Sequence, residues 1–179
     1  MLDKHMLRST FLGNDEQGHP RFDNHRTEVG EATFQLKYRS DLAQANRLAE
    51  AVAENIYQKL DHVGFIVPMP ASTQRPFQPV TAVARSLGRI VSRPVFERVL
   101  LKSRPREPLK DLPTKAEKVE AIAGSFSIEN QIAKEGAWNV LLLDDLFHTG
   151  ATMEAACASL RTYAKVKNVY VAASRGNER

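Results

Sequence analysis

The sequence has a single cysteine, Cys157, so the chain can form no internal disulfide and no cysteine-based zinc site. Cys157 shares a helical spacing with Met153 and Leu160, which indicates a thiol packed in the core rather than a reactive one. No apolar run approaches the roughly 20 residues of a membrane-spanning helix, and the amino terminus lacks the apolar core of a secretory signal. We therefore expect a cytoplasmic protein without contact to a membrane.

The sequence also lacks a large excess of charge of either sign. The formal net charge is only +4 at pH 7, and the positive residues are spread along the chain, with their densest part at 102–118. So small an excess identifies no partner, and it leaves nucleic-acid binding and homodimer formation open. The hydrophobic share of 42% and the charged share of 26% are ordinary for a globular protein. We expect one α/β domain that spans residues 1–179, with a full-sized core.

Residues 1–33 are polar and show no regular apolar period. They are predicted to form loops or short strands that pack on the main domain or are partly disordered. His5, His19 and His25 lie here without a recognisable metal-ligand spacing, so we interpret them as surface histidines. The core is expected at 34–175.

Apolar patterns in the core predict strands that alternate with helices. Residues 34–38 fit either a short strand or a helix end, and Asp41 is expected to cap the following helix, whose apolar face would include Leu42, Ala45, Ala49 and Val52. The expected strands are 64–67, 95–101, 125–128, 140–143 and 168–173, and the expected helices are 41–60, 79–91, 116–123 and 153–164. This alternation predicts a mostly parallel central sheet flanked by helices.

The stretch from Val140 to Thr152 carries the clearest functional pattern. The continuous apolar run 140–143 suits a central strand buried on both faces, and Asp144 and Asp145 follow it directly. Ligands of parallel sheets bind beyond the carboxyl ends of the strands, where two neighbouring acids can accept hydrogen bonds from the vicinal hydroxyls of a ribose. The alternative is a buried strand that ends in two solvated acids before an ordinary helix.

A phosphate cradle is predicted immediately after the two acids. A glycine between hydroxyl residues opens the next helix, and such a turn leaves backbone N–H groups that point at one spot, next to the positive end of the helix dipole. We expect a sugar 5′-phosphate to bind at His148, Thr149, Gly150, Ala151 and Thr152.

An apolar run, two adjacent acids and Thr-Gly-x-Thr together resemble the signature of type I phosphoribosyltransferases, which bind 5-phosphoribosyl 1-pyrophosphate (PRPP). The resemblance implies their three-layer fold and transfer of the 5-phosphoribosyl group to a nucleobase or small amine, with release of pyrophosphate. It makes Asp144 and Asp145 the catalytic residues and PRPP or a nucleoside monophosphate the ligand. We expect Mg²⁺ to be carried mainly by PRPP, since the sequence shows no dedicated protein cage.

The turn from Val67 to Ser72 is similar to the pyrophosphate loop of that family. By position, Ala71 and Ser72 match best, and Arg75 either meets the pyrophosphate or is solvated. The whole turn could instead be a rigid connection between strand and helix.

The basic, proline-interrupted segment 102–118 lies where the family has a flexible lid. Lys102, Arg104, Arg106 and Lys110 would close over pyrophosphate and exclude water. A solvated loop and a nucleic-acid contact are the alternatives.

Within the family, residues 34–175 most resemble the ComF-type branch, also described as amidophosphoribosyltransferase-like. The resemblance rests on 36–39, on 66–70, on the loop that leads to 124–126, and on DDLFHTGAT. Those proteins commonly begin with a four-cysteine zinc element, which one cysteine cannot supply. Any acceptor-binding hood would be built from residues 1–33, where no base-binding pattern is legible. Because no general base is evident, a non-catalytic PRPP- or nucleotide-binding ComF-like protein in DNA uptake or regulation stays open, as does an unrelated α/β binding module.

Overall fold

The computed structural model describes residues 3–4, 6–14, 17, 19–71, 77–103, 114, 121–122, 124–147 and 150–176. Within 3–12, 21–25, 145–147 and 174–176 it describes the backbone alone.

A four-stranded parallel sheet forms the centre of the protein, in the order β1-β8-β7-β4. Its strands are β1 (Asp3–Lys4), β4 (Val63–Pro68), β7 (Trp138–Phe147) and β8 (Val166–Gly176). The strands predicted at 64–67, 140–143 and 168–173 are therefore present. β7 lies between β4 and β8, which confirms that the strand before the two acids is central.

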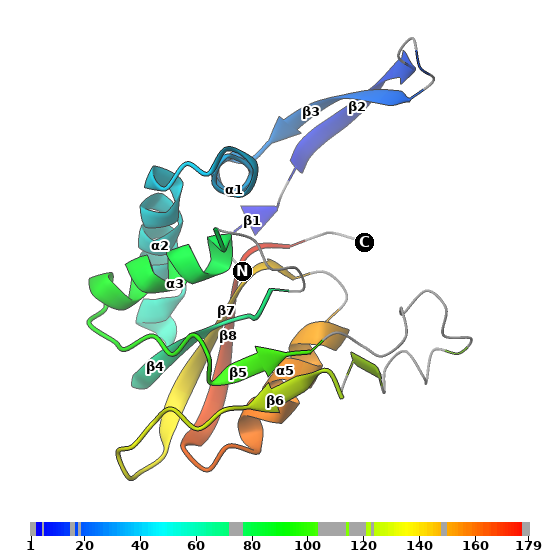
Figure 1. Ribbon diagram of the computed structural model, residues 1–179. Helices are drawn as coiled ribbons and strands as arrows, with labels where there is room; N and C mark the ends of the chain where they lie inside the picture. The colour runs from blue at the N-terminus through cyan, green and yellow to red at the C-terminus, as the bar shows by residue number, and fades with distance from the viewer. Residues whose placement is uncertain are drawn as a thin grey trace.

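Helices cover both faces of this sheet (Figure 1). One face carries α1 (Glu28–Arg39), α2 (Ala43–Asn55) and α3 (Pro79–Ile90), followed along α2 by the short 3₁₀ helix η1 (Tyr57–Lys59). The other face carries α5 (Ala151–Arg161) and a two-stranded antiparallel ribbon of β5 (Leu100–Lys102) and β6 (Phe126–Ile128). The resulting three-layer α/β arrangement with a parallel central sheet confirms the predicted fold class.

The apolar run of β7 is continuous because both faces of the strand are covered. Leu141 and Leu143 pack toward α1, α2 and α3, while Val140 and Leu142 pack toward α5. All four side chains are at most 1% exposed. Full burial of a side chain of this size stabilises the folded state by about 1.5 to 3 kcal/mol.

Local capping explains where α1 begins. Thr27 precedes the helix, and its hydroxyl oxygen accepts a hydrogen bond from the Gly30 amide at 3.0 Å. Glu31 in the first turn accepts from Gln35 and pairs with Arg26 at 3.2 Å, and these two contacts, the Gln35 hydrogen bond foremost, lower the pKa of Glu31. Negative charge near a helix N-terminus is favourable. The start of α1 is therefore encoded locally.

The amino-terminal segment has more regular structure than predicted. β2 (Met6–Asn14) and β3 (Pro20–Arg26) pair as an antiparallel ribbon that projects from the body in Figure 1. Residues 34–38 belong to α1, so the helical reading of that stretch is the right one. An antiparallel ladder is held by backbone hydrogen bonds, so it can form without the apolar period that the prediction looked for.

Two further expectations need correction. The predicted strand 95–101 is regular only from Leu100, because Val95 makes just an isolated bridge to Ile66. Leu42 was expected on the apolar face of α2 but is 60% exposed, since the helix begins at Ala43 and Leu48 takes the buried position. Asp41 does contribute at this end, where its carboxylate accepts from the Ala43 amide at 3.0 Å. Of the helix expected at 116–123, only 121–122 are described, and both are helical.

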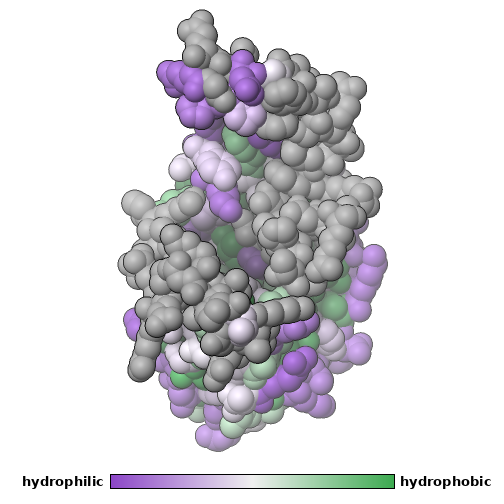
Figure 2. Space-filling model, turned by 90° about the vertical axis from the view of Figure 1, so that its right-hand side faces the viewer, coloured by the Kyte–Doolittle hydropathy of each residue, from purple (hydrophilic) through white to green (hydrophobic). Residues whose placement is uncertain are grey.

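The surface shown in Figure 2 mixes hydrophilic and hydrophobic residues, and hydrophilic residues gather at the upper and lower ends of its described part. Among the helices that the structure describes, none has the length and hydropathy needed to cross a membrane.

Candidate functional site

Asp144 lies where the central sheet opens at its carboxyl edge. β4 ends at Pro68, and the Met69 amide then donates to the Leu143 carbonyl at 2.7 Å. Asp144 follows this contact between β4 and β7. Beyond it, β7 continues beside β8, with Asp144 opposite Ala173. The side chain of Asp144 is half-buried. Asp144 therefore lies beside the end of β4, but β7 extends further than predicted, to Phe147, so Asp144 is not at the end of its own strand.

The structure describes the turn into α5 from Gly150 onward. Gly150 has φ 78° and ψ −32°, a conformation that strains any residue with a Cβ. Gly150 provides no side-chain cap to the helix that begins at Ala151. As in any α-helix, the first amides, including those of Ala151 and Thr152, have no acceptor within the helix. This part of the predicted cradle can bind an anion at the positive end of the helix dipole.

Lys102 in the neighbouring layer interacts electrostatically with Asp144. Lys102 is the last residue of β5, and its Nζ lies 5.4 Å from the centroid of the Phe126 ring on β6. Burial lowers the pKa of Lys102 below its ordinary value, and the negative charge of Asp144 opposes that shift. Lys102 was predicted only as part of a loop over pyrophosphate, whereas the structure brings its charge to the edge of β7.

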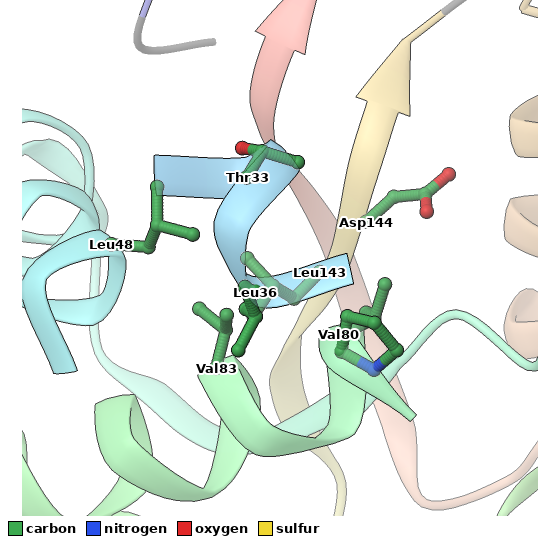
Figure 3. A pocket seen from close by; sticks show the side chains of 8 residues that line it. Thr33, Leu36, Leu48, Val80, Val83, Leu143 and Asp144 are labelled. Carbon is green, nitrogen blue, oxygen red and sulfur yellow. The ribbon is translucent and has the colours of Figure 1, made fainter. Parts of the chain in front are cut away.

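An apolar wall stands on the other side of Asp144 (Figure 3). A space of about 10 Å³, room for roughly one water molecule, lies between α1, α2, α3 and β7. Its lining is Thr33, Leu36, Leu48, Pro79, Val80, Val83, Leu143 and Asp144. In the figure, the carboxylate of Asp144 points away from the leucine and valine side chains, and the Thr33 hydroxyl already donates to the Val29 carbonyl at 2.7 Å. The apolar faces of α1, α2 and α3 build this wall, and the helix at 28–39 was not predicted from the sequence.

The other predicted site residues are described only in part. Ala71 is exposed just beyond β4, and Asp145 belongs to β7 by its backbone. The remaining predicted positions fall outside the described residues: Ser72, Arg75, Arg104, Arg106, Lys110, His148 and Thr149. Among the residues with described side chains, no group of three His, Cys, Asp or Glu could hold a metal ion.

Comparisons with known proteins find similarity at the level of structure. No family model matches the chain, and no curated protein matches its sequence. The structure superposes on an adenine phosphoribosyltransferase with a TM-score of 0.51 and 13% identity, over 97% of this chain and 87% of that one. The adenine phosphoribosyltransferase of Saccharomyces cerevisiae gives a TM-score of 0.48 at 10% identity, with 96% of this chain and 85% of that chain covered. The enzyme of Trypanosoma brucei, solved with AMP, pyrophosphate and ribose-5-phosphate, gives 0.48 at 14% identity, with 92% and 62% covered.

The first of these similarities shows the fold, which is that of the type I phosphoribosyltransferases. It confirms the fold expected from the Val140–Thr152 pattern.

Proposed function

We propose that this protein is a PRPP-dependent phosphoribosyltransferase that moves a 5-phosphoribosyl group to a nucleobase or small amine and releases pyrophosphate. One observation carries the proposal. In a chain with the phosphoribosyltransferase fold, Asp144 lies on the central strand β7 just past the end of β4, and Gly150, with its positive φ and no side-chain cap, leads into the N-terminus of α5. These are an acceptor for sugar hydroxyls and a donor set for a phosphate, in that order along the chain.

The reaction breaks the bond between the ribose C1 and the pyrophosphate oxygen and forms a bond from C1 to a nitrogen of the acceptor. The electron pair of the broken bond leaves with pyrophosphate, so C1 becomes cation-like, and the proton that the acceptor nitrogen loses passes to pyrophosphate or to water. The carboxylate of Asp144, with Asp145, would accept hydrogen bonds from the ribose hydroxyls, and its negative charge favours the cationic sugar. The amides at the start of α5 would hold the 5′-phosphate and fix the sugar for attack.

The leaving pyrophosphate needs positive charge on its side of the sugar. Lys102, whose charge reaches Asp144, stands at the root of the basic segment 102–118 and meets this need. We propose that Arg104 and Arg106 act with it, and that Ala71, Ser72 and Arg75 bind the other end of the pyrophosphate. Mg²⁺ fits this arrangement, because it keeps several waters and binds through substrate phosphates with one or two carboxylates.

Pyrophosphate release tests the proposal. The protein is incubated with PRPP, Mg²⁺ and a panel of nucleobases and small amines, and pyrophosphate is measured for the wild type and for Asp144→Asn. Release with at least one acceptor is expected, with a loss of about 100-fold or more in Asp144→Asn. Asp61→Asn, a change at an exposed acid, should retain the rate. No release with any acceptor, and no rise in melting temperature with PRPP or a nucleoside monophosphate at millimolar concentration, would overturn the proposal.

A second candidate function is a non-catalytic protein of the ComF-type branch that binds PRPP or a nucleotide and serves regulation or DNA uptake. We propose it because no general base is evident in the sequence. PRPP would then raise the melting temperature without turnover, and single-stranded DNA would bind with a steep dependence on salt. Pyrophosphate release with any acceptor excludes this candidate.

A further inference from the structure

A second hollow lies on the face of α3 that is turned away from Asp144. It is an open groove of about 770 Å³ between α2, α3 and the chain that follows α3. This volume falls within the range of roughly 300 to 1,000 Å³ that is usual for small-molecule sites. Val80 and Val83 of α3 line the space at Asp144, whereas Arg85, Ser86 and Arg89 of the same helix line the groove. The groove is therefore separate from the site described above.

Three guanidinium groups line this groove, and each is held by a hydrogen bond. Arg85 donates twice to Glu97, at 2.5 and 2.8 Å. Arg89 donates to the Ser86 hydroxyl at 3.0 Å, and that hydroxyl donates to Asn46 on α2 at 2.8 Å. The Arg93 Nε donates to the Tyr57 hydroxyl at 3.3 Å. Guanidinium groups that are already oriented lose less conformational freedom when they bind an anion.

Close packing at Gly88 holds the chain after α3 against the helix. The Arg93 amide donates to the Gly88 carbonyl at 2.9 Å. A Cβ on Gly88 would stand 2.8 Å from the Arg93 carbonyl oxygen and 2.5 Å from the Val95 side chain. The glycine thus permits the chain after α3 to fold back against the helix and bring Arg89 and Arg93 to one groove.

The charges in the groove do not balance. Of the described residues that line it, three are arginines and Glu97 is the one acid, and Glu97 is paired with Arg85. Arg89 and Arg93 make no ion pair with any residue whose side chain is described. Two positive charges therefore face the groove, which matches a phosphate dianion, a group that the guanidinium fork can bind with two parallel hydrogen bonds. Next to them lie apolar side chains, Leu42, Phe77 and Val95, and Leu42 is 60% exposed.

We propose that this groove binds a nucleotide-sized organic phosphate, with the phosphate on Arg89 and Arg93 and an apolar ring against Phe77 and Val95. This binding function goes beyond the phosphoribosyl transfer proposed above and does not depend on it. Since α3 lines both the groove and the wall beside Asp144, a ligand in the groove would contact a helix that also borders the predicted active site.

Calorimetric titration of the full chain with ATP in the absence of Mg²⁺ tests the proposal. Wild type should bind one ATP per chain, more tightly than inorganic pyrophosphate or adenosine, because each of these offers half of the contacts. Asp144→Asn should bind ATP as the wild type does, since Asp144 is not part of the groove. Arg89→Gln/Arg93→Gln should weaken ATP binding by about 100-fold, or tenfold for each lost charged contact.

Arg47→Gln/Arg98→Gln is the matched control, because it removes the same charge from two exposed arginines outside the groove. It should bind ATP within about twofold of the wild type. Absence of ATP binding to the wild type at millimolar concentration overturns the proposal. The proposal is also overturned if ATP binding is lost in Asp144→Asn but retained in Arg89→Gln/Arg93→Gln. Binding of pyrophosphate as tight as that of ATP overturns it too.

Discussion

The charge of Lys102 at the end of β5 interacts with the carboxylate of Asp144 at the edge of β7. The two residues lie 42 positions apart in the sequence, and their strands belong to different sheets. Lys102 also lies over the ring of Phe126, 5.4 Å from its centroid. The layer of β5 and β6 thereby brings positive charge to the place where we expect pyrophosphate to leave a ribose held by Asp144.

Asp144→Asn should lower the pKa of Lys102 further. Burial already moves the pKa of Lys102 down from 10.5, and Asp144 is the group that opposes the shift. Without that carboxylate the neutral amine becomes more abundant below the ordinary lysine pKa, so Lys102 should react faster with an amine-selective acylating reagent. Peptide mass spectrometry over a pH series measures the midpoint at this residue.

The control is Asp61→Asn, which should leave the midpoint unchanged. If the titration midpoint of Lys102 in Asp144→Asn is unchanged or lies at higher pH than in the wild type, the interaction between Lys102 and Asp144 is contradicted. The lowered pKa also makes stability depend on pH. Between the pKa of Lys102 in the folded protein and the ordinary lysine pKa, the unfolded chain binds more protons than the folded one, so the free energy of unfolding rises with pH. In Asp144→Asn that window should extend to lower pH.

Leu141→Ala should destabilise the protein strongly. Leu141 is 0% exposed in the central strand, and its truncation leaves a cavity between the sheet and the helices α1, α2 and α3. The expected loss in the free energy of unfolding is about 2 to 5 kcal/mol. Leu42→Ala makes the same chemical change at a side chain that is 60% exposed, and it should cost less than about 0.5 kcal/mol. Urea denaturation of both variants checks the contrast, and equal losses would refute the assigned burial.

Thr27→Ala should destabilise α1 by about 1 kcal/mol, because the Gly30 amide loses its acceptor. Thr27→Ser keeps a hydroxyl oxygen at the same position and should retain most of the stability. Thermal unfolding of the two variants separates the hydrogen bond from the packing of the threonine methyl group. Equal melting temperatures for the alanine and serine variants would exclude the cap as a stabilising contact.

Gly150→Ala should cost roughly 1 to 2 kcal/mol of stability, because alanine is strained at φ 78°. If the turn is a phosphate cradle, the same change should weaken ribose 5-phosphate binding as well. Gly150→Asn is the matched variant, since asparagine adopts positive φ more readily, and it should be the milder of the two. A stability equal to that of wild type in Gly150→Ala would show that the turn does not require glycine.

Much of the fold could be predicted from sequence because the responsible signals are local. The continuous run 140–143 indicated a strand buried on both faces, and it is the central strand of the sheet. The apolar period at 79–91 predicted α3 to within a residue at each end. Neither signal needs knowledge of distant contacts.

Features that depend on pairing between distant segments could not be predicted. The β2–β3 ribbon has no apolar period. The segment before Leu100 pairs with the central sheet only through the isolated bridge between Val95 and Ile66. At the site, Asp144 and Gly150 were found from their spacing, whereas the approach of Lys102 requires the β5–β6 layer. The groove at Arg89 was also missed, because its arginines gather only when the chain after α3 folds back at Gly88.

A crystal structure of the protein with ribose 5-phosphate tests the central claim most directly. The account predicts the phosphate on the amides at the start of α5, beside Gly150, and the ribose hydroxyls on Asp144 and Asp145. Ribose 5-phosphate bound elsewhere, with this edge of the sheet empty in the same crystal, would contradict it.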